Sequence, residues 1–328
     1  MHPRASTPAS RLLLFAALVV LGAMTACTRQ VRAPAWAYPI LPDSTAVVPM
    51  DPEPRHVPDS QRTFVQRELT NRNGAAPDWH PEDHPKMPPV VAQGRQPDVL
   101  ACGYCHLPDG SGRPENASLS GLTFNYLRAQ LLAFRQGQRE GSVPTRGPQV
   151  RMIALTKPLT DAEIDAAATY FAAIPPRSYQ QVIETDEVPV TKVAGWILTP
   201  EPGNRREPLG ARIVETSADY ERFENRDSRN PYLIYVPRGS VARGRELVTT
   251  GAGGRIPTCA SCHGPELKGL ADVPRLAGRS PSFLMRQLCD IRNGTRSGGP
   301  SELMKPIVAA LSEDDMTAIV AYLASLKP

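Results

Sequence analysis

The sequence predicts a mainly α-helical protein, in which two copies of one small helical domain are joined by an irregular, partly β insertion. We place the domains at residues 90–176 and 241–328 and the insertion at residues 177–240. Three observations lead to this fold class. The motif Cys-x-x-Cys-His occurs twice, at Cys102–His106 and at Cys259–His263. The chain after the first motif aligns with the chain after the second, and both copies end in a segment with the pattern of a capped amphipathic helix.

The internal repeat extends well beyond the two motifs. Cys102 and Cys259 are 157 residues apart (259 − 102), and the same offset aligns residues 126–139 with residues 283–296. These two segments share Leu, Gln, Arg and Gly at fixed spacing. A fixed offset over such a distance indicates that one structural unit has been duplicated.

The last segment of each copy begins at a capping residue. After a contraction of five residues the offset is 152 (312 − 160), which aligns Thr160 with Ser312 and Glu163 with Asp315. A Thr or Ser followed three residues later by an acidic residue is typical of a helix N-terminus. Apolar residues then follow at helical spacing. Each copy is therefore expected to end in an amphipathic helix.

The N-terminus predicts export. An apolar run from Leu12 to Ala23 follows two arginines, as in a secretory signal, and it is shorter than the roughly 20 apolar residues of a membrane span. Small residues before Cys27 resemble the bacterial lipoprotein signal. We predict a lipoprotein-type signal peptide at residues 1–26 and lipidation of Cys27, with ordinary cleavage and a retained membrane anchor as the alternatives.

Residues 27–89 predict an extended or irregular arm. Thirteen prolines lie between Ala33 and Asp98, and proline disrupts helix interiors and central strands. One short helix is expected from Ser60 to Leu69. We expect the arm to join the N-terminal anchor to the first domain and to pack on that domain. Its aromatic residues are the expected contacts: Trp36, Tyr38 or Trp79.

The insertion belongs to neither copy of the repeat. The stretches Lys192–Thr199 and Pro208–Glu215 are separated by the turn-rich residues Pro200–Asn204. Two such stretches around a turn predict a β-hairpin. We therefore expect the insertion to be a structured bridge.

Composition excludes some classes of protein. The 328 residues are 41% apolar, which suits folded domains and not a disordered chain, and the net charge of +4 comes from scattered residues. A nucleic-acid binder would gather its basic residues on one face, so we expect no nucleic-acid partner. Four of the six cysteines lie in the two motifs. Their use there takes precedence over the disulfides that are usual in exported proteins.

Both motifs have the spacing of covalent haem attachment. Residues at i, i+3 and i+4 lie on one side of a short helix, so Cys102 and Cys105 would form thioethers at one edge of a porphyrin while His106 ligates its iron. The second motif offers the same groups: Cys259, Cys262 and His263. A zinc site is the alternative, but it would need four Cys or His ligands in each unit, and neither copy contains a further histidine. We predict two covalently bound haem c groups with iron.

The repeat also indicates the sixth iron ligand. Met152 is the only methionine between Pro88 and Leu284, and Met304 stands at the matching position (304 − 152 = 152). Each methionine lies ahead of the final helix of its copy, where the chain can fold back across the open face of a haem. A lone methionine is more often core filler, but two at matched positions favour iron ligation.

Several other residues have less specific interpretations. We interpret Met285 as surface or gap filler, Met316 as core, and Cys289 as a buried inert thiol in preference to an intermolecular bridge. Four arginines near the ends of the middle helices either neutralise haem propionates or complement the dipole of a solvated helix end: Arg135, Arg139, Arg292 and Arg296. His80 and His84 have i,i+4 spacing, but the prolines beside them predict a surface loop in preference to a second metal site.

Each copy resembles a class I cytochrome c domain. The resemblance is carried by the Cys-x-x-Cys-His motif, a glycine-bearing middle helix, and a methionine before a capped terminal helix. The pair resembles the two-domain dihaem cytochromes c of bacterial periplasms over about residues 90–175 and 241–328. The resemblance implies that the cysteines bind haem covalently and that four residues are the axial ligands: His106, Met152, His263 and Met304.

Histidine and methionine at both axial positions raise the haem potential and leave no vacancy for a substrate. We therefore expect an electron carrier that is not itself an enzyme. The resemblance implies redox protein partners, such as a dehydrogenase, a quinol-oxidising complex or a terminal oxidase, and a periplasmic location with a lipid anchor in the membrane. The alternatives are a fixed electron-transfer subunit of a larger dehydrogenase or oxidase complex and, less favoured, a dihaem peroxidase in which one iron loses its sixth ligand.

Overall fold

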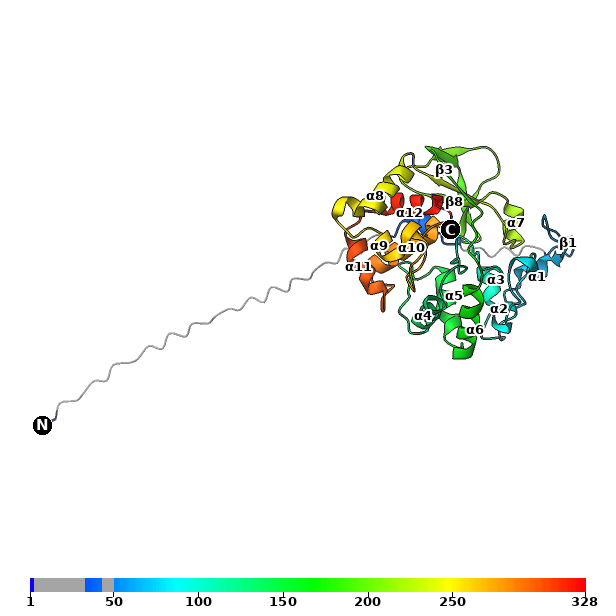
Figure 1. Ribbon diagram of the computed structural model, residues 1–328, viewed down its shortest axis with the longest axis horizontal. Coiled ribbons are helices and arrows are strands. Elements are labelled where there is room, and N and C mark those ends of the chain that lie inside the picture. The colour runs from blue at the N-terminus through cyan, green and yellow to red at the C-terminus, as the bar shows by residue number, and fades with distance from the viewer. Residues whose placement is uncertain (3–32, 43–49) are drawn as a thin grey trace. The chain divides into compact units, whose positions relative to one another are not determined.

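The computed structural model describes residues 1–2, 33–42 and 50–328. Every helix and strand among them lies in the unit Val31–Pro328, whose ribbon is drawn in Figure 1. The predicted lipidation site Cys27 and nearly all of the predicted signal peptide lie outside the described residues. Within the described ranges, no helix is both long and apolar enough to cross a membrane.

The first copy of the repeat is helical. Its elements are α3 (Cys102–His106), α4 (Phe124–Arg135), α5 (Gly147–Thr156) and α6 (Asp161–Ala172). The side chain of Thr160 accepts a hydrogen bond from the Glu163 backbone N–H, and the Glu163 carboxylate accepts one from the Thr160 N–H. The predicted capping box is therefore confirmed. The apolar face of α6 packs against α4 and against α2 (Pro89–Ala92), which closes one hydrophobic core.

The second copy repeats this arrangement, with the longer helix α8 at the position of α2. Its elements are α8 (Ser240–Gly254), α9 (Ala260–His263), α10 (Pro281–Arg292), α11 (Ser301–Ala309) and α12 (Glu313–Ser325). Ser312 and Asp315 form the second predicted capping box. Helix α8 packs along α12 at Gly244, where a Cβ atom would lie 2.0 Å from the carbonyl oxygen of Ala318. Only glycine permits so close an approach of the two backbones.

The two copies contact each other at a seam. Each hydrogen bond described here has a counterpart in which the two copies exchange roles. Arg139 and Arg296 form an isolated antiparallel bridge. Arg139 donates to Gln130 of its own copy at 3.0 Å and to Gln287 of the other copy at 2.6 Å. Arg296 donates to Gln287 at 2.8 Å and to Gln130 at 3.2 Å. Because the two arginines are matched in the repeat, and so are the two glutamines, the seam has approximate two-fold symmetry.

The insertion is folded, but its strands pair differently from the prediction. β5 (Thr191–Ala194) and β6 (Ile197–Pro200) form a hairpin within the first predicted stretch. The chain reverses at Gly195 and Trp196, which both have positive φ, as a two-residue hairpin turn requires. Only the last two residues of the second stretch belong to a strand that follows, β8 (Val214–Ser217). The two stretches that were expected to form one hairpin therefore do not pair with each other.

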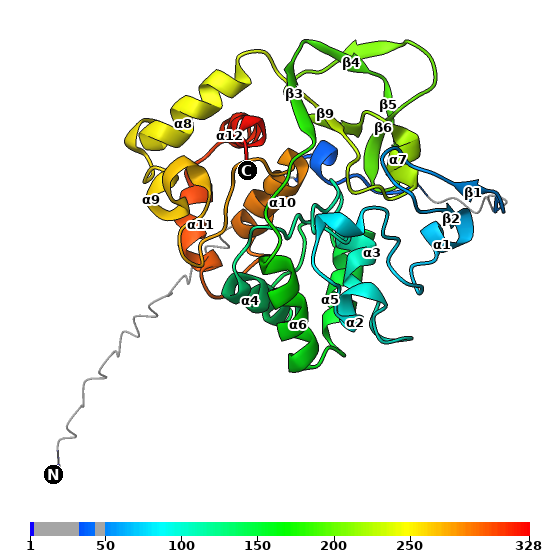
Figure 2. The same ribbon diagram turned by 45° about the vertical axis from the view of Figure 1, so that its right-hand side comes forward.

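The remaining strands of the insertion form a three-stranded sheet and a second ribbon. β8 pairs antiparallel with β9 (Tyr232–Val236), and β9 pairs parallel with β3 (Gln180–Glu184). β4 (Glu187–Pro189) pairs with β7 (Arg206–Pro208), and the short helix α7 (Tyr220–Glu224) follows β8. In Figure 2 the insertion lies beside both α12 and the N-terminal elements.

The described part of the arm packs on the first domain at Tyr104, as predicted, but the aromatic residues expected to make this contact lie against the second copy and the insertion. The elements of the arm are η1 (Ala35–Ala37), β1 (Pro54–Arg55), β2 (Phe64–Val65), α1 (Gln66–Thr70) and η2 (Pro81–Asp83). Tyr38 donates from its hydroxyl to Asp290 of α10 in the second copy at 2.8 Å. Trp79 donates from its indole to the backbone carbonyl of Asn225 in the insertion at 2.6 Å. The helix expected from Ser60 begins only at Gln66. The residues just before it, Phe64 and Val65, are extended in β2, which pairs with β1.

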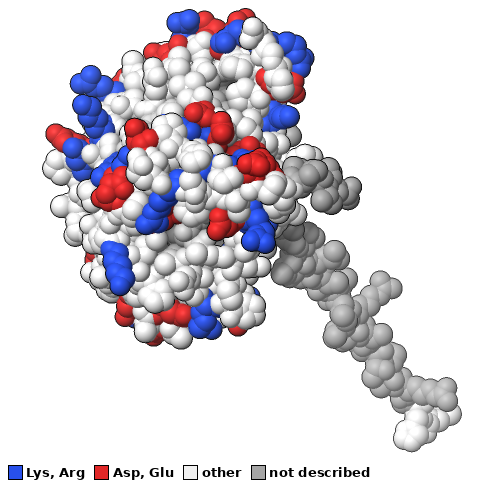
Figure 3. All heavy atoms as spheres, turned by 90° about the vertical axis from the view of Figure 1, so that its right-hand side faces the viewer, with Lys and Arg blue, Asp and Glu red and all other residues white. Residues whose placement is uncertain are grey.

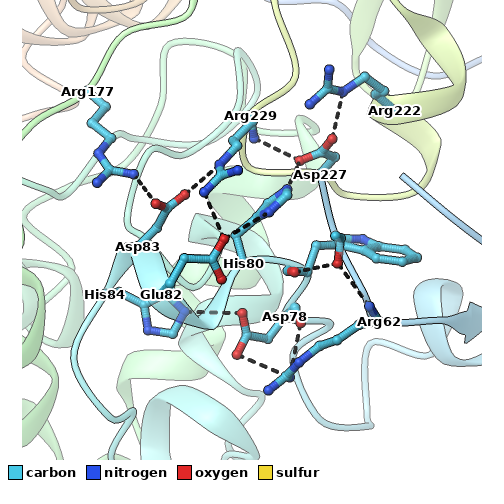
Figure 4. Close-up of polar contacts among 12 residues, drawn as sticks. Arg62, Asp78, His80, Glu82, Asp83, His84, Arg177, Arg222, Asp227 and Arg229 are labelled. Carbon is cyan, nitrogen blue, oxygen red and sulfur yellow. Dashed lines mark hydrogen bonds and ion pairs between the residues drawn. The ribbon is translucent and has the colours of Figure 1, made fainter. Parts of the chain in front are cut away.

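A buried network of charged side chains fastens the arm to the insertion, as Figure 4 shows. The predicted surface loop at His80 is wrong: His80 is only 1% exposed, and its Nε2 lies 3.0 Å from the Asp227 carboxylate. Arg222 donates to the other oxygen of Asp227 at 2.6 Å. Nearby, Arg229 donates to Asp83 at 2.7 Å. The prolines beside His80 were the only signal in the local sequence. They could not reveal its burial, because its partner Asp227 lies 147 residues further along the chain.

This network predicts sensitivity to acid through Asp83. Burial alone would raise its pKa, but hydrogen bonds from Arg229 and Arg177 outweigh that effect and hold the pKa at about 2. Because the folded pKa lies below the unfolded value of 3.8, the ion pairs stabilise the fold above about pH 4, and this stability is lost as the pH falls toward 2. We expect Asp83→Asn to cost roughly 1–2 kcal/mol at pH 7. The difference from the native chain should shrink between pH 4 and pH 2 in urea titrations, and a constant difference would contradict the assignment.

Candidate haem-binding sites

The two motif histidines have the same orientation. His106 Nδ1 lies 2.8 Å from the carbonyl oxygen of Ala117, and His263 Nδ1 lies 2.8 Å from that of Pro274. Ala117 and Pro274 are themselves matched in the repeat (274 − 117 = 157). Because a carbonyl can only accept, Nδ1 carries the proton and Nε2 keeps its lone pair. This second contact is what orients a metal-ligating imidazole.

Burial favours the neutral form of the histidine in both motifs. It lowers the pKa of His106 and of His263, although the backbone bond to each ring opposes the effect. It raises the pKa of the Cys102 thiol to about 12 and also raises that of Cys105. None of the four motif cysteines forms a disulfide in the described structure. No cluster of three or more His, Cys, Asp or Glu in the described ranges is arranged to hold a metal ion.

The first copy encloses a cavity of about 510 Å³, which is lined by Cys102, Cys105, His106 and Met152. Ligand sites typically measure about 300–1,000 Å³. Its apolar wall comes from α4 and α6 and includes Phe134. Thus the structure brings together the four residues that the sequence singled out in this copy, with Met152 reaching the cavity from α5.

In the second copy the corresponding residues lie on two neighbouring elements. Cys259 caps α9, which contains Cys262 and His263, and Met304 lies on α11. Figures 1 and 2 both show α9 and α11 side by side. His263 is buried, with 8% of its surface exposed, whereas Cys262 is exposed.

Comparison with known proteins places these sites in a family. Residues 241–327 match the cytochrome c family. Cytochrome c-554(548) of Halomonas halodenitrificans is 40% identical over 72 residues, which are 22% of this chain and 87% of that relative. The chain belongs to the cytochrome c family.

Two further relatives of this cytochrome match a much longer stretch. The thiosulfate dehydrogenase electron acceptor of Stutzerimonas stutzeri is 28% identical over 236 residues, which are 71% of this chain and 82% of the relative. Cytochrome c4 of Azotobacter vinelandii is 26% identical over 240 residues, which are 72% of this chain and 89% of the relative. Together with the two motifs, these matches identify a dihaem class I cytochrome c with covalently bound haem c. The cytochrome is an electron carrier and not itself an enzyme.

Buried arginines in the cytochrome's cavity fit the acidic propionates of haem. Arg139, Arg146 and Arg279 line the cavity, and the Nε of each is buried without a hydrogen-bond partner in the described structure. Burial lowers the pKa of Arg139 and Arg146 to about 9 and that of Arg279 to about 10, so all three stay charged at neutral pH. Uncompensated buried cations are costly. An anionic group in the cavity would remove that cost.

The predicted arginines divide into two roles. Arg135 donates to the carbonyl of Leu159, and Arg292 donates to that of Val308, so both hold the chain just ahead of the final helices. Arg139 is only 8% exposed and belongs to the seam, so it does not end a solvated helix. Arg279 was missed because the repeat aligns it with Leu122 (279 − 157), and comparison of the copies gave no signal there.

The remaining predictions concern buried sulfur atoms. Met316 is 0% exposed and Cys289 is 1% exposed, so both core assignments are confirmed. Met285 is also 0% exposed. Of the two interpretations, the gap filler is therefore confirmed and the surface position is wrong, because Met285 belongs to the core of the second copy.

Proposed function

We propose that His106 with Met152, and His263 with Met304, are the axial ligand pairs of two haem domains at residues 90–176 and 241–328. The matched Nδ1 contacts of the two histidines support this most directly, because they leave each Nε2 free. In the first domain Met152 lines the same cavity as His106. A haem with these ligands accepts and releases one electron and offers no vacancy to a substrate.

The chain's own residues would hold and tune the first haem. Cys102 and Cys105 fix one edge covalently, and buried aromatic residues such as Phe171 exclude water from the histidine side. Arg139, Arg146 and Arg279 supply positive charge for the propionates. A dry site with the propionate charge neutralised favours the reduced state.

The proposal is tested on protein matured in a host with haem-attachment machinery. A pyridine haemochrome assay should give two covalent haems per chain, and the near-infrared methionine-to-iron band should have the intensity of two such ligand pairs. One haem per chain would contradict the equivalence of the copies. A missing band would contradict methionine ligation and favour a peroxidase-like site.

We also propose that the cytochrome works in the periplasm, tethered by a lipid on Cys27. The apolar run and the small residues before Cys27 support this. Cys27→Ser should abolish incorporation of labelled fatty acid. Labelled fatty acid that persists in Cys27→Ser would contradict lipidation of this cysteine.

The electron donor that we propose is a periplasmic dehydrogenase, and a stable complex with that enzyme is the second candidate arrangement. Similarity to a thiosulfate dehydrogenase electron acceptor over 71% of the chain supports a dehydrogenase donor. The folded arm and insertion offer the additional surface that a permanent complex needs. Co-purification at salt concentrations above 0.5 M, about where surface charge contacts are screened, would distinguish a fixed subunit from a diffusing carrier.

Removal of one buried cation should lower the potential of the first haem. Arg146 is 3% exposed and lines the cavity, so Arg146→Gln should make reduction less favourable by an amount on the order of tens of millivolts. Spectroelectrochemical titration resolves the two potentials. Arg95→Gln is the matched control, because Arg95 is exposed and pairs with Glu163. Equal shifts of the potential in both variants would show that Arg146 does not act at the haem site.

A further inference from the structure

The two haem-attachment helices differ in exposure. In the first domain Gly103 and Tyr104 are buried, with Tyr104 only 5% exposed. The matched residues of the second domain, Ala260 and Ser261, are exposed. Cys262 is exposed as well, whereas its counterpart in the first domain is partly buried. One attachment helix is therefore covered and the other is open.

The cover over the first helix consists of the arm and the insertion. Tyr104 donates from its hydroxyl to the carbonyl of Leu69 at 3.3 Å. From the insertion, the guanidinium of Arg226 lies 3.7 Å from the centre of the Tyr104 ring, and it donates to the Tyr104 carbonyl at 2.8 Å and to the Leu69 carbonyl at 2.9 Å. A Cβ atom on Gly103 would lie 3.0 Å from the Val91 carbonyl and 3.1 Å from Ala76. Residues of the arm, together with Val91 of α2, thus lie directly against α3.

The open helix presents an uncharged face. Within residues 257–271 the only acidic or basic residues are Glu266 and Lys268, which pair with each other at 3.2 Å. Leu270 is 52% exposed, and Leu303, which precedes Met304 on α11, is 77% exposed. By contrast, basic and acidic side chains are interspersed on the face of Figure 3, which shows the side where α1 and α7 lie in Figure 1.

We propose that the redox partner of this cytochrome docks on α9, at the second haem site, and that the arm and the insertion close the attachment edge of the first. This inference rests on the proposed function, because it takes each motif to hold a haem. The thioether edge of a haem lies against its attachment helix, and a layer of protein outside that helix lengthens the path of an electron. The partner that fits α9 is a redox protein with an uncharged, partly apolar face around its own cofactor. Contacts between redox proteins are typically small, below about 1,200 Å².

In the exchange itself one electron passes from the reduced partner to the second site. The partner is oxidised by one electron and the cytochrome is reduced by one. No bond forms or breaks, and no proton is transferred. Exchange with the first site then follows across the seam between the copies. Because the docking face carries no net charge, the rate should change less than about threefold between 50 and 300 mM salt, in contrast to charge-steered association.

The test uses the full chain with both haems and a reduced monohaem class I cytochrome c as electron donor. Ser261→Glu places a charge on the uncharged face, and we expect it to slow electron uptake in stopped-flow at least tenfold. Asn73→Glu places the same charge on an exposed residue of the arm, in the cover of the first helix, and should change the rate less than twofold. Equal slowing by both variants, or slowing by Asn73→Glu alone, would overturn the proposal.

A footprint gives a second readout that does not depend on electron transfer. Hydrogen–deuterium exchange with the monohaem cytochrome in excess should show protection at residues 257–271 and none at residues 66–76 or 220–227. Protection at the latter two segments, or none at residues 257–271, would overturn the docking face. Haem content and the near-infrared band of the same samples test the proposed function separately, since loss of either reports on ligation and not on docking.

Discussion

Replacement of Met152 by histidine is expected to lower the potential of one haem by a few tenths of a volt, roughly in line with the range that axial ligands control. A thioether sulfur favours ferrous iron, whereas a second imidazole favours the ferric state, so the change from His/Met to His/His ligation makes reduction harder. Half of the near-infrared band should disappear, because the second site keeps its methionine. Two covalent haems should remain, since both cysteine pairs are unchanged.

The same spectra supply the controls for this prediction. Met304→His should remove the other half of the band and lower the other potential. Met316→Leu should change neither, because Met316 is fully buried in the core of the second copy. An intact band in Met152→His would show that Met152 is not a ligand.

The parts of the fold that the sequence predicted are those whose signals are local and occur twice. The attachment motifs and the two capping boxes each involve residues three or four positions apart, and the repeat supplied an independent second copy of each. Such signals need no knowledge of the tertiary structure. The histidine and methionine of the first copy both line one cavity.

The parts that the sequence did not predict depend on contacts between distant segments. His80 is buried by Asp227, 147 residues away, and the arm's Tyr38 reaches Asp290, 252 residues away. Proline-rich composition indicates only that helices are interrupted, so it could not reveal where the arm docks. In the insertion, the hairpin turn forms at Gly195 and Trp196 and not at the turn-rich Pro200–Asn204. Positive φ at Gly195 and at Trp196 gives the turn the twist that a hairpin needs.

Asp227 is the residue whose loss should destabilise the described structure most. Its side chain is 0% exposed, and its two oxygens accept hydrogen bonds from Arg222 and from the backbone N–H of Arg229 while His80 lies 3.0 Å away. Asp227→Ala removes the anion, so buried His80 keeps only Glu82 at 3.7 Å and Arg222 loses its carboxylate partner. Breaking a buried pair from one side costs about 3–5 kcal/mol, and guanidinium unfolding followed by circular dichroism measures the loss.

Asp186→Ala is the matched control, because Asp186 forms an ion pair with Arg238 while 73% of its side chain stays exposed. An exposed pair contributes about 0–1 kcal/mol, so this variant should unfold at nearly the native denaturant concentration. Asp227→Ala should also expose the arm, since the network joins η2 to the insertion, and limited proteolysis should cut first between residues 71 and 89. If both aspartate variants lost the same small free energy, burial of the network would not be what fastens the arm, and its stability would have to come from the apolar contacts of Leu69 and Trp79 instead.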